Sequence, residues 1–139
     1  MQIFIKLKKR YLILKTLYLK KKVINELKKK DIHLICLAGF MKILSKSFIK
    51  NFKGKILNIH PSLLPKYKGL NTHERAIRNK DKYSGCTVHF VNSRLDSGEI
   101  INQKKVRIKK LDTPKTLAKR ILIQEHKLYP AAIIKALSL

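Results

Sequence analysis

The sequence predicts an α/β fold, a mixed and twisted sheet flanked by helices, within a single domain. Four runs rich in apolar residues have the length of strands: residues 32–37, 55–59, 85–91 and 99–108. Segments with helical features precede or separate the first three runs, and a long helical segment follows the fourth. This alternation indicates an α/β sheet, and the direct succession of the last two strands indicates that it is mixed.

The start of the chain, residues 1–30, is an atypical Lys-rich segment that we expect to be helical. Four of its apolar residues fit one helical face: Ile13, Leu17, Ile24 and Leu27. Asp31 interrupts this pattern, and the apolar run 32–37 after it is typical of a buried strand. Gly39 ends that strand and permits a close approach of backbone to a ligand.

The next segment begins with a helix cap. Ser45 is a good N-cap for a helix that reaches Phe52, and Gly54 provides its stop. The strand 55–59 then leads into a proline- and glycine-containing loop at residues 60–70. This loop follows a strand end, which is where functional loops of α/β sheets lie.

Two further helices are predicted from their start signals. Asn71, followed by Glu74, resembles a capping box for a helix that reaches about Asn79. A cap followed by proline at residues 112–114 predicts a long helix. We expect Pro130 to separate this helix from a last short one at the C-terminus.

The net charge of +25 would usually indicate nucleic acid or acidic membranes as partners. Here the arginines are few and the lysines are scattered along the whole chain, a pattern that a genome rich in lysine codons also produces. We therefore expect neither a nucleic-acid nor a membrane partner, although the positive field would attract anionic small molecules.

The remaining composition favours a cytoplasmic protein. No run is long and apolar enough to span a bilayer, and the lysines within the first apolar stretch argue against a signal peptide. Cys36 and Cys86 lie in apolar, strand-like runs, so we expect buried thiols in a reducing compartment rather than metal ligands.

Candidate catalytic residues lie where two strands end. They are Asn58, His60 and Asp96. Asn58 and His60 are two residues apart at the end of a strand, and Asp96 follows the strand 85–91. Side chains two apart on a strand share a face. An amide beside an imidazole suits a carbonyl that becomes an oxyanion, and a nearby carboxylate favours the imidazolium. The combination suggests acyl or formyl transfer without a covalent enzyme intermediate.

Several blocks of sequence resemble the glycinamide ribonucleotide formyltransferase family. They include Leu37-Ala-Gly-Phe-Met-Lys-Ile-Leu-Ser45, Asn58-Ile-His-Pro-Ser-Leu-Leu-Pro65 with Lys66-Tyr-Lys-Gly-Leu-Asn-Thr-His73, Leu95-Asp-Ser-Gly98 and Gln124-Glu-His-Lys-Leu-Tyr-Pro130. The blocks run from about residue 32 to the C-terminus. The resemblance implies a Rossmann-like formyltransferase fold, here partial, over residues 31–139 as the catalytic portion. It also implies transfer of the formyl group of 10-formyltetrahydrofolate to glycinamide ribonucleotide in de novo purine synthesis, with no metal.

The resemblance also implies roles for individual residues. His60 would be the catalytic acid and base, Asn58 a donor to the formyl oxygen, and Asp96 the group that raises the pKa of the histidine. Glu125 would contact glycinamide ribonucleotide near its amine. The folate pocket would be walled by two segments and by Asn58: Met41, Lys42, Ile43 and Leu44, then Asn92, Ser93, Arg94 and Leu95. Lys42 stands where the family usually has arginine.

One part of the family pattern has no match. The family begins with a strand and a glycine-rich loop that cradles the substrate phosphate, whereas the first glycine here is Gly39. We therefore expect a truncated protein whose activity is impaired, and a missing N-terminal half or a homo-oligomer as partner.

Two other functions remain open. One is another formyl-folate enzyme, formyltetrahydrofolate hydrolase or methionyl-tRNA formyltransferase, since these resemble the chain in the same three catalytic residue types. The other is an inactive basic remnant that binds nucleic acid.

Overall fold

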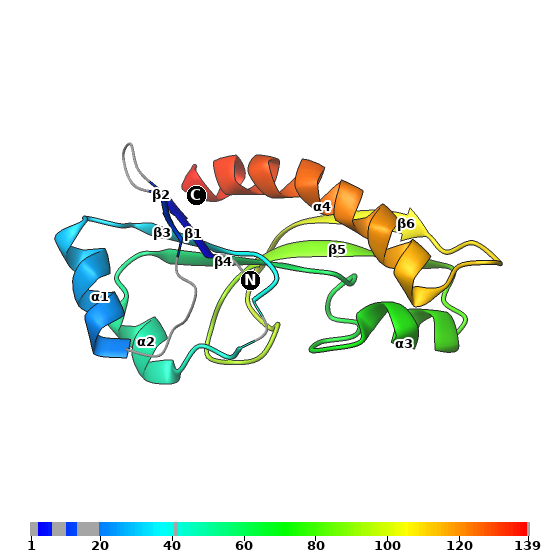
Figure 1. The fold of residues 1–139 in the computed structure, drawn as a ribbon, viewed down its shortest axis with the longest axis horizontal. Helices are drawn as coiled ribbons and strands as arrows, with labels where there is room; N and C mark the ends of the chain where they lie inside the picture. The colour runs from blue at the N-terminus through cyan, green and yellow to red at the C-terminus, as the bar shows by residue number, and fades with distance from the viewer. Residues whose placement is uncertain (1–2, 7–10, 14–19, 41, 139) are drawn as a thin grey trace.

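The structure is a computed structural model that describes residues 3–6, 11–13, 20–40 and 42–138. Its elements form one sheet with helices on both sides (Figure 1). The helices are α1 (Lys20–Lys29), α2 (Lys46–Asn51), α3 (Thr72–Arg78) and α4 (Pro114–Leu137). The strands are β1 (Ile3–Lys6), β2 (Tyr11–Ile13), β3 (Leu34–Leu37), β4 (Lys55–His60), β5 (Tyr83–Phe90) and β6 (Ile100–Arg107).

The sheet has the strand order β2-β1-β3-β4-β5-β6. Strands β3 and β4 are parallel, and the other neighbours pair antiparallel. The predicted α/β fold with a mixed sheet is confirmed. The parallel pair lies in the interior of the sheet, where its apolar side chains are covered on both faces.

Two apolar clusters pack on opposite faces of the sheet. Leu34 and Cys36 of β3 belong to the cluster beneath α4, whereas the alternate residues Ile35 and Leu37 pack with α1 and α2. Strand β4 alternates in the same way, with Leu57 and Ile59 toward α4 and Ile56 on the other face. Asn58 and His60 therefore share the face of Ile56, beyond the end of the second cluster.

The prediction that residues 1–30 are helical is wrong for part of this segment. Residues 3–6 and 11–13 are strands, and the helix α1 begins only at Lys20. Strand β1 pairs with the edge of β3, where Phe4 lies opposite Cys36. The edge of β3 would otherwise leave its backbone N–H and C=O groups unpaired. Pairing of β1 with that edge satisfies them, and this gain outweighs the preference for a helix that the spacing of the apolar residues indicates. The expected face residue Leu17 lies outside the described residues.

The prediction that Pro130 separates two helices is also wrong, because α4 continues through it. Proline removes a single N–H, so only the carbonyl of His126 loses its helical partner. The residues around it are fixed by burial: Leu128, Ala132 and Ala136 belong to the cluster on the sheet. Burial of that face outweighs the lost hydrogen bond.

The predicted helix caps have mixed outcomes. The Ser45 side chain accepts the N–H of Phe48, and Thr113 forms a capping box ahead of Pro114, so both starts are confirmed. The capping box predicted at Asn71 is wrong, because Asn71 has a left-handed conformation and its side chain caps nothing.

Candidate active site

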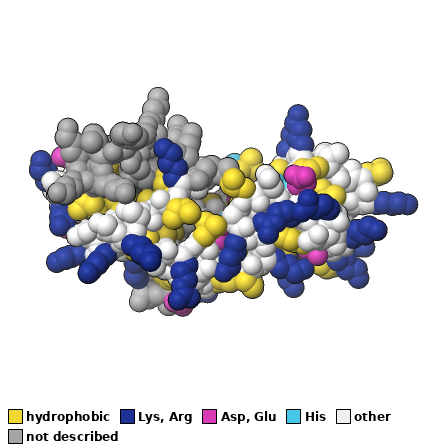
Figure 2. All heavy atoms as spheres, turned by 90° about the horizontal axis from the view of Figure 1, so that it is seen from below, with side chains coloured by type: hydrophobic (Ala, Val, Ile, Leu, Met, Phe, Trp, Pro, Cys, Tyr) yellow, Lys and Arg dark blue, Asp and Glu magenta, His cyan; other side chains and the backbone are white. Residues whose placement is uncertain are grey.

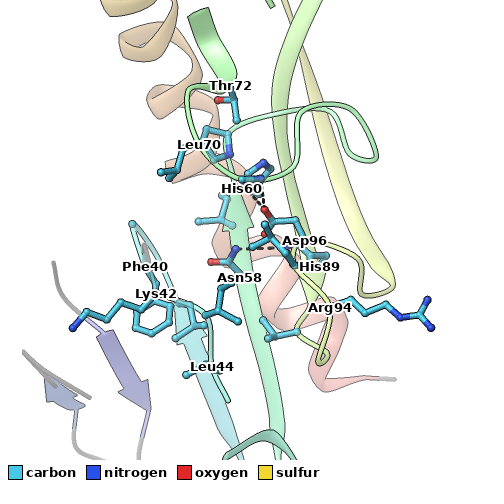
Figure 3. A pocket seen from close by; sticks show the side chains of 18 of the residues that line it. Phe40, Lys42, Leu44, Asn58, His60, Leu70, Thr72, His89, Arg94 and Asp96 are labelled. Atoms are coloured by element: carbon cyan, nitrogen blue, oxygen red, sulfur yellow. Dashed lines mark hydrogen bonds and ion pairs between the residues drawn. The ribbon is translucent and has the colours of Figure 1, made fainter. Parts of the chain in front are cut away.

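A cavity of ≈ 590 Å³ lies at the carboxyl ends of the parallel strands β3 and β4 (Figure 3). Its walls come from the end of β3 with its following loop, the end of β4 with its following loop, the start of α3, the end of β5 with its following loop, and one residue of α4. Ligands of open α/β sheets bind at this edge. The volume is in the range of pockets that hold small organic molecules.

Strand β4 places two of the candidate catalytic side chains in this cavity. Asn58 and His60 are two residues apart and point to the same face, as the sequence predicts. His89 of β5 lies directly opposite Asn58 in the strand register, and their side chains are 3.4 Å apart from Asn58 Nδ2 to His89 Nε2. His60 and His89 are both buried, so the cavity floor is polar but shielded from water.

Asp96 joins the two histidines. Its Oδ2 lies 3.4 Å from His60 Nδ1, and its Oδ1 lies 3.6 Å from His89 Nε2. The backbone N–H of Gly69 donates to Oδ2 at 2.8 Å. Asp96 has a left-handed backbone conformation with φ 42°, and only 9% of its side chain is exposed. The structure thus brings Asn58, His60 and Asp96 together in one cavity, although Asp96 is distant from the other two in sequence.

The His60 ring faces acceptors at both nitrogens. Its Nε2 lies 2.9 Å from the carbonyl oxygen of Tyr67, which can only accept, so Nε2 carries a proton. Its Nδ1 faces the Asp96 carboxylate. Burial lowers the pKa of His60, and this effect exceeds the opposing influence of the Tyr67 carbonyl and Asp96. Asp96 acts on this pKa in the expected direction, since its charge raises it, but burial outweighs the carboxylate.

The pKa of Asp96 is lower than usual. Burial alone would raise it, but the hydrogen bond from His89, the N–H of Gly69 and the nearby His60 together outweigh burial. The carboxylate is therefore ionised at neutral pH and keeps a negative charge beside both imidazoles.

His89 also has a defined orientation. Its Nδ1 donates to the carbonyl of Phe90 at 2.8 Å, and its Nε2 lies 3.4 Å from the Asn58 amide nitrogen and 3.6 Å from Asp96 Oδ1. The Asn58 amide carries two N–H groups, so at least one of them stays available to a ligand whichever role His89 Nε2 has.

The upper walls of the cavity are largely apolar. Three exposed side chains surround it: Ile43 is 70% exposed, Leu70 59% and Leu95 48%. Of the predicted folate-binding residues, the cavity is lined by Lys42, Ile43, Leu44, Asn58, Asn92, Arg94 and Leu95. Ser93 does not line it, and Met41 lies outside the described residues. Leu70 was missed, since nothing in its loop distinguishes it from a turn residue.

Glu125 and His73 complete the polar lining. Burial raises the pKa of Glu125, against the opposing charge of His126. His73 has a buried Nδ1 without a hydrogen-bond partner, and burial followed by the charge of His60 lowers its pKa. Both side chains would be better satisfied by a polar ligand than by the surrounding protein.

Within the described residues, no group of three or more His, Cys, Asp or Glu side chains could hold a metal ion. No helix in that part of the chain is long and apolar enough to cross a membrane.

Known proteins resemble this chain in both sequence and structure. Residues 3–133 match the family model for formyl transferase. The chain is 48% identical over 99 residues to phosphoribosylglycinamide formyltransferase from Escherichia coli (strain K12). The aligned region covers 71% of this chain and 47% of that protein. It is 52% identical over 103 residues to the trifunctional purine biosynthetic protein adenosine-3 from Homo sapiens. Here the aligned region covers 74% of this chain and 10% of that protein.

Solved structures agree with the sequence comparisons. The crystal structure of phosphoribosylglycinamide formyltransferase from Bacillus halodurans superposes with a TM-score of 0.80 at 43% identity, and covers 86% of this chain and 61% of that one. The predicted Rossmann-like formyltransferase fold is confirmed by this likeness. The chain spans about half the length of its bacterial relative from E. coli. With most of its residues inside the family model, the chain belongs to the formyl transferase family.

Proposed function

We propose that this chain is an enzyme that transfers the formyl group of 10-formyltetrahydrofolate to the amine of glycinamide ribonucleotide, a step of de novo purine synthesis. The observation that carries the proposal is the placement of Asn58, His60 and Asp96 on the floor of one cavity. Membership of the family and the names of the relatives support the same reaction.

The three side chains suit each stage of this transfer. The substrate amine attacks the formyl carbon, a C–N bond forms, and the carbonyl oxygen becomes an oxyanion. The free N–H of Asn58 and a protonated His60 would stabilise that charge. The adduct collapses by breaking the bond to the folate nitrogen, which takes up a proton while the former amine loses one. His60 is the group placed to move this proton.

Asp96 has an electrostatic role in the proposal. The pKa of His60 is lowered by burial, so the free enzyme holds this ring mostly neutral at physiological pH. The ionised Asp96 beside Nδ1 makes the imidazolium less costly when it forms in the adduct. This arrangement stabilises charge at the moment of reaction more than in the free enzyme.

The cavity walls suit a folate. Ile43, Leu44 and Leu95 offer apolar surface to a flat ring system, and Lys42 and Arg94 add cations for a negatively charged ligand. Lysine lacks the planar fork of an arginine, so Lys42 can attract a carboxylate but cannot hold it with paired hydrogen bonds. Asn92 lies on the same wall.

Glu125 would bind the amine of glycinamide ribonucleotide, since a buried carboxylate gains from a nearby cation. Residues 1–38 contain no glycine, so they offer no glycine-rich cradle to the substrate phosphate. The 139-residue chain by itself should therefore bind this substrate weakly and turn it over slowly.

The remaining expectations belong to the same proposal: a cytoplasmic enzyme that uses no metal, with a second copy of the chain as a partner. The other formyl-folate activities and a nucleic-acid-binding remnant are not favoured, since the relatives from E. coli and Bacillus halodurans are both phosphoribosylglycinamide formyltransferases by name.

Two measurements test the function. Calorimetry with a non-reactive folate analogue should detect binding by the folded chain. Product formation from both substrates, followed by mass spectrometry, should be slow, should increase when a glycine-rich N-terminal half of the E. coli relative is added, and should be lost in His60→Ala. A folded chain that neither binds the folate nor forms product with the added half would refute the proposal.

A further inference from the structure

The orientation of His60 depends on a residue outside the cavity. His60 Nε2 donates to the backbone carbonyl of Tyr67 at 2.9 Å. Tyr67 lies in the loop between β4 and α3 and is not among the residues that line the cavity. This hydrogen bond links the ring to the loop from the side away from Asp96, so the position of the Tyr67 carbonyl decides which nitrogen holds the proton.

The Tyr67 side chain is anchored at its far end. Its hydroxyl donates to Asp81 Oδ2 at 2.7 Å and accepts from Asn79 Nδ2 at 3.0 Å. The same carboxylate is held by Lys66 Nζ at 3.1 Å. Tyr67 has a left-handed backbone conformation with φ 55°, which non-glycine residues rarely adopt. The loop adopts it because these contacts hold the ring in place.

Arg75 of α3 holds the same loop from another direction. Its guanidinium lies 5.0 Å from the centre of the Tyr67 ring, a cation–π contact. Its Nη1 donates to the carbonyl of Lys68 at 2.7 Å and lies 3.3 Å from that of Leu70. The helix thus fixes both the ring of Tyr67 and the backbone that follows it. Arg75, Asp81 and Tyr67 form a unit, which we call the tyrosine clamp.

We propose that the tyrosine clamp positions the catalytic histidine: Tyr67, held by Asp81 and Arg75, sets the orientation and the tautomer of the His60 ring. The proposal rests on the proposed role of His60. It makes Tyr67 a positioning residue, which acts on the reaction through His60 without touching the substrates.

The electrostatic consequence has a definite direction. The charged groups that influence the pKa of His60 come from several elements: Asp96 from the loop after β5, His89 from β5 and Arg75 from α3. His73 of α3 faces the same ring, and burial followed by the charge of His60 lowers its pKa. Burial lowers this pKa, and the Tyr67 carbonyl is the first of the groups that oppose it. A loosened clamp weakens that hydrogen bond, so it should lower the pKa of His60 further and release the proton from its fixed place on Nε2.

Tyr67→Phe in the full chain tests the proposal, because it removes only the hydroxyl anchor. The matched control is Tyr83→Phe at the start of β5, where the side chain is 45% exposed and makes no hydrogen bond in the described structure. Nitrogen-15 NMR of the imidazoles, followed through a pH titration, reports both the pKa and the tautomer of each histidine. His60 in the parent should be the Nε2–H tautomer when neutral.

In Tyr67→Phe, the pKa of His60 should fall and both tautomers should be populated. Turnover should fall about threefold to tenfold, as expected for one hydrogen bond, with little change in the folate KM. Asp81→Asn should reproduce both effects, and the double variant should add little to either single change, because all act through one contact. Tyr83→Phe should change neither readout.

Parental titration and tautomer of His60 in folded Tyr67→Phe and Asp81→Asn would overturn the proposal. Asp81→Asn decides the matter if Tyr67→Phe does not fold. The NMR result does not depend on turnover, so it tests the clamp separately. A parent that neither binds the folate nor forms product with the added N-terminal half would refute the proposed function, and the titration would still decide whether the clamp orients His60.

Discussion

At the scale of single residues, burial and nearby charges shift the pKa values of the site residues in opposite directions. His60 has hydrogen-bond acceptors at both nitrogens, which favour the imidazolium, yet burial keeps its pKa below the usual value. Asp96 has the opposite balance, since hydrogen bonds and the two histidines outweigh burial. The result is an ionised carboxylate beside a ring that can take up a proton when an oxyanion forms nearby.

Asp96→Asn tests this balance while keeping the shape of the side chain. Loss of the negative charge removes one of the influences that raise the pKa of His60, so the imidazolium becomes more costly in the adduct. We expect turnover to fall about 100-fold or more, with little change in folate affinity. Steady-state kinetics and calorimetry on the variant, in the presence of the added N-terminal half, measure the two effects separately.

Near-parental turnover of Asp96→Asn would contradict the assigned role. A large loss of folate affinity would instead indicate that the carboxylate mainly holds the loop, through its hydrogen bond with Gly69.

Glu125→Gln should stabilise the free protein at neutral pH. Burial raises the pKa of Glu125, so folding favours its protonated form. That contribution to stability is present below the unfolded pKa and is lost as the pH rises through the folded pKa, which leaves a buried charge at neutral pH. Glutamine has no charge to bury, so the urea midpoint of the variant should rise while its affinity for the amine substrate falls.

The control is Glu74→Gln in the first turn of α3, an exposed glutamate that a helix N-terminus favours. This change should leave the midpoint unchanged or slightly lower. Equal midpoints for the parent and Glu125→Gln would show that the buried charge costs nothing.

At the scale of elements, sequence patterns predicted local structure well. They failed where packing between distant elements outweighs a local preference. The period of two in β4 predicted that Asn58 and His60 share a face, and the caps at Ser45 and Thr113 are as expected. These features depend on neighbours within four residues. Helix α4 runs through Pro130 because its buried face packs on the sheet, and no local signal reports that packing.

The candidate site shows the same division. Asn58, His60, Asp96 and Glu125 could be singled out from sequence because their types and their motifs are specific. The Tyr67 carbonyl and the Gly69 N–H could not, since every residue carries these groups and only the fold decides which of them meet a side chain. The net lowering of the pKa of His60 likewise depends on burial by segments distant in sequence.

The loop between β5 and β6 should depend on glycine at position 98. A Cβ on Gly98 would collide with the carbonyl group of Phe90, whose N–H donates to Glu99 at 2.8 Å to close the loop. Gly98→Ala should therefore displace the loop that carries Asp96. We expect a loss of at least about 2 kcal/mol in the free energy of unfolding, together with weaker folate binding.

Gly39→Ala is the matched control. Its Cβ would meet no heavy atom within 4 Å, and the positive φ alone should cost about 1 kcal/mol. Urea unfolding of both variants compares the two costs, and a smaller loss for Gly98→Ala than for Gly39→Ala would contradict the steric argument.

At the scale of the whole molecule, positive charge dominates the surface. The chain has a net charge of +25, and lysine and arginine side chains are scattered over the face in Figure 2, many of them along its outline. Like charges repel one another, so each further proton that the protein binds should lower the stability of the fold. The same field attracts anionic ligands toward the cavity, an effect that salt should weaken.

Acid should destabilise the fold at a pH set by the cavity histidines. Burial lowers the pKa of His60 and His73 below their ordinary value of 6.5. A histidine of this kind binds fewer protons when folded, so its contribution to stability is complete above about pH 6.5 and is lost as the pH falls through the folded pKa. Asp96, with a lowered pKa, loses its contribution in the same direction at lower pH.

We expect the free energy of unfolding to fall as the pH drops below about 6.5 toward the lowered pKa values of His60 and His73. Urea unfolding at constant ionic strength measures this slope. His73→Gln should flatten it, because glutamine does not titrate, whereas His33→Gln should not, since the His33 side chain is 75% exposed. If both variants kept the parental slope, the acid sensitivity would come from the overall charge and not from the cavity.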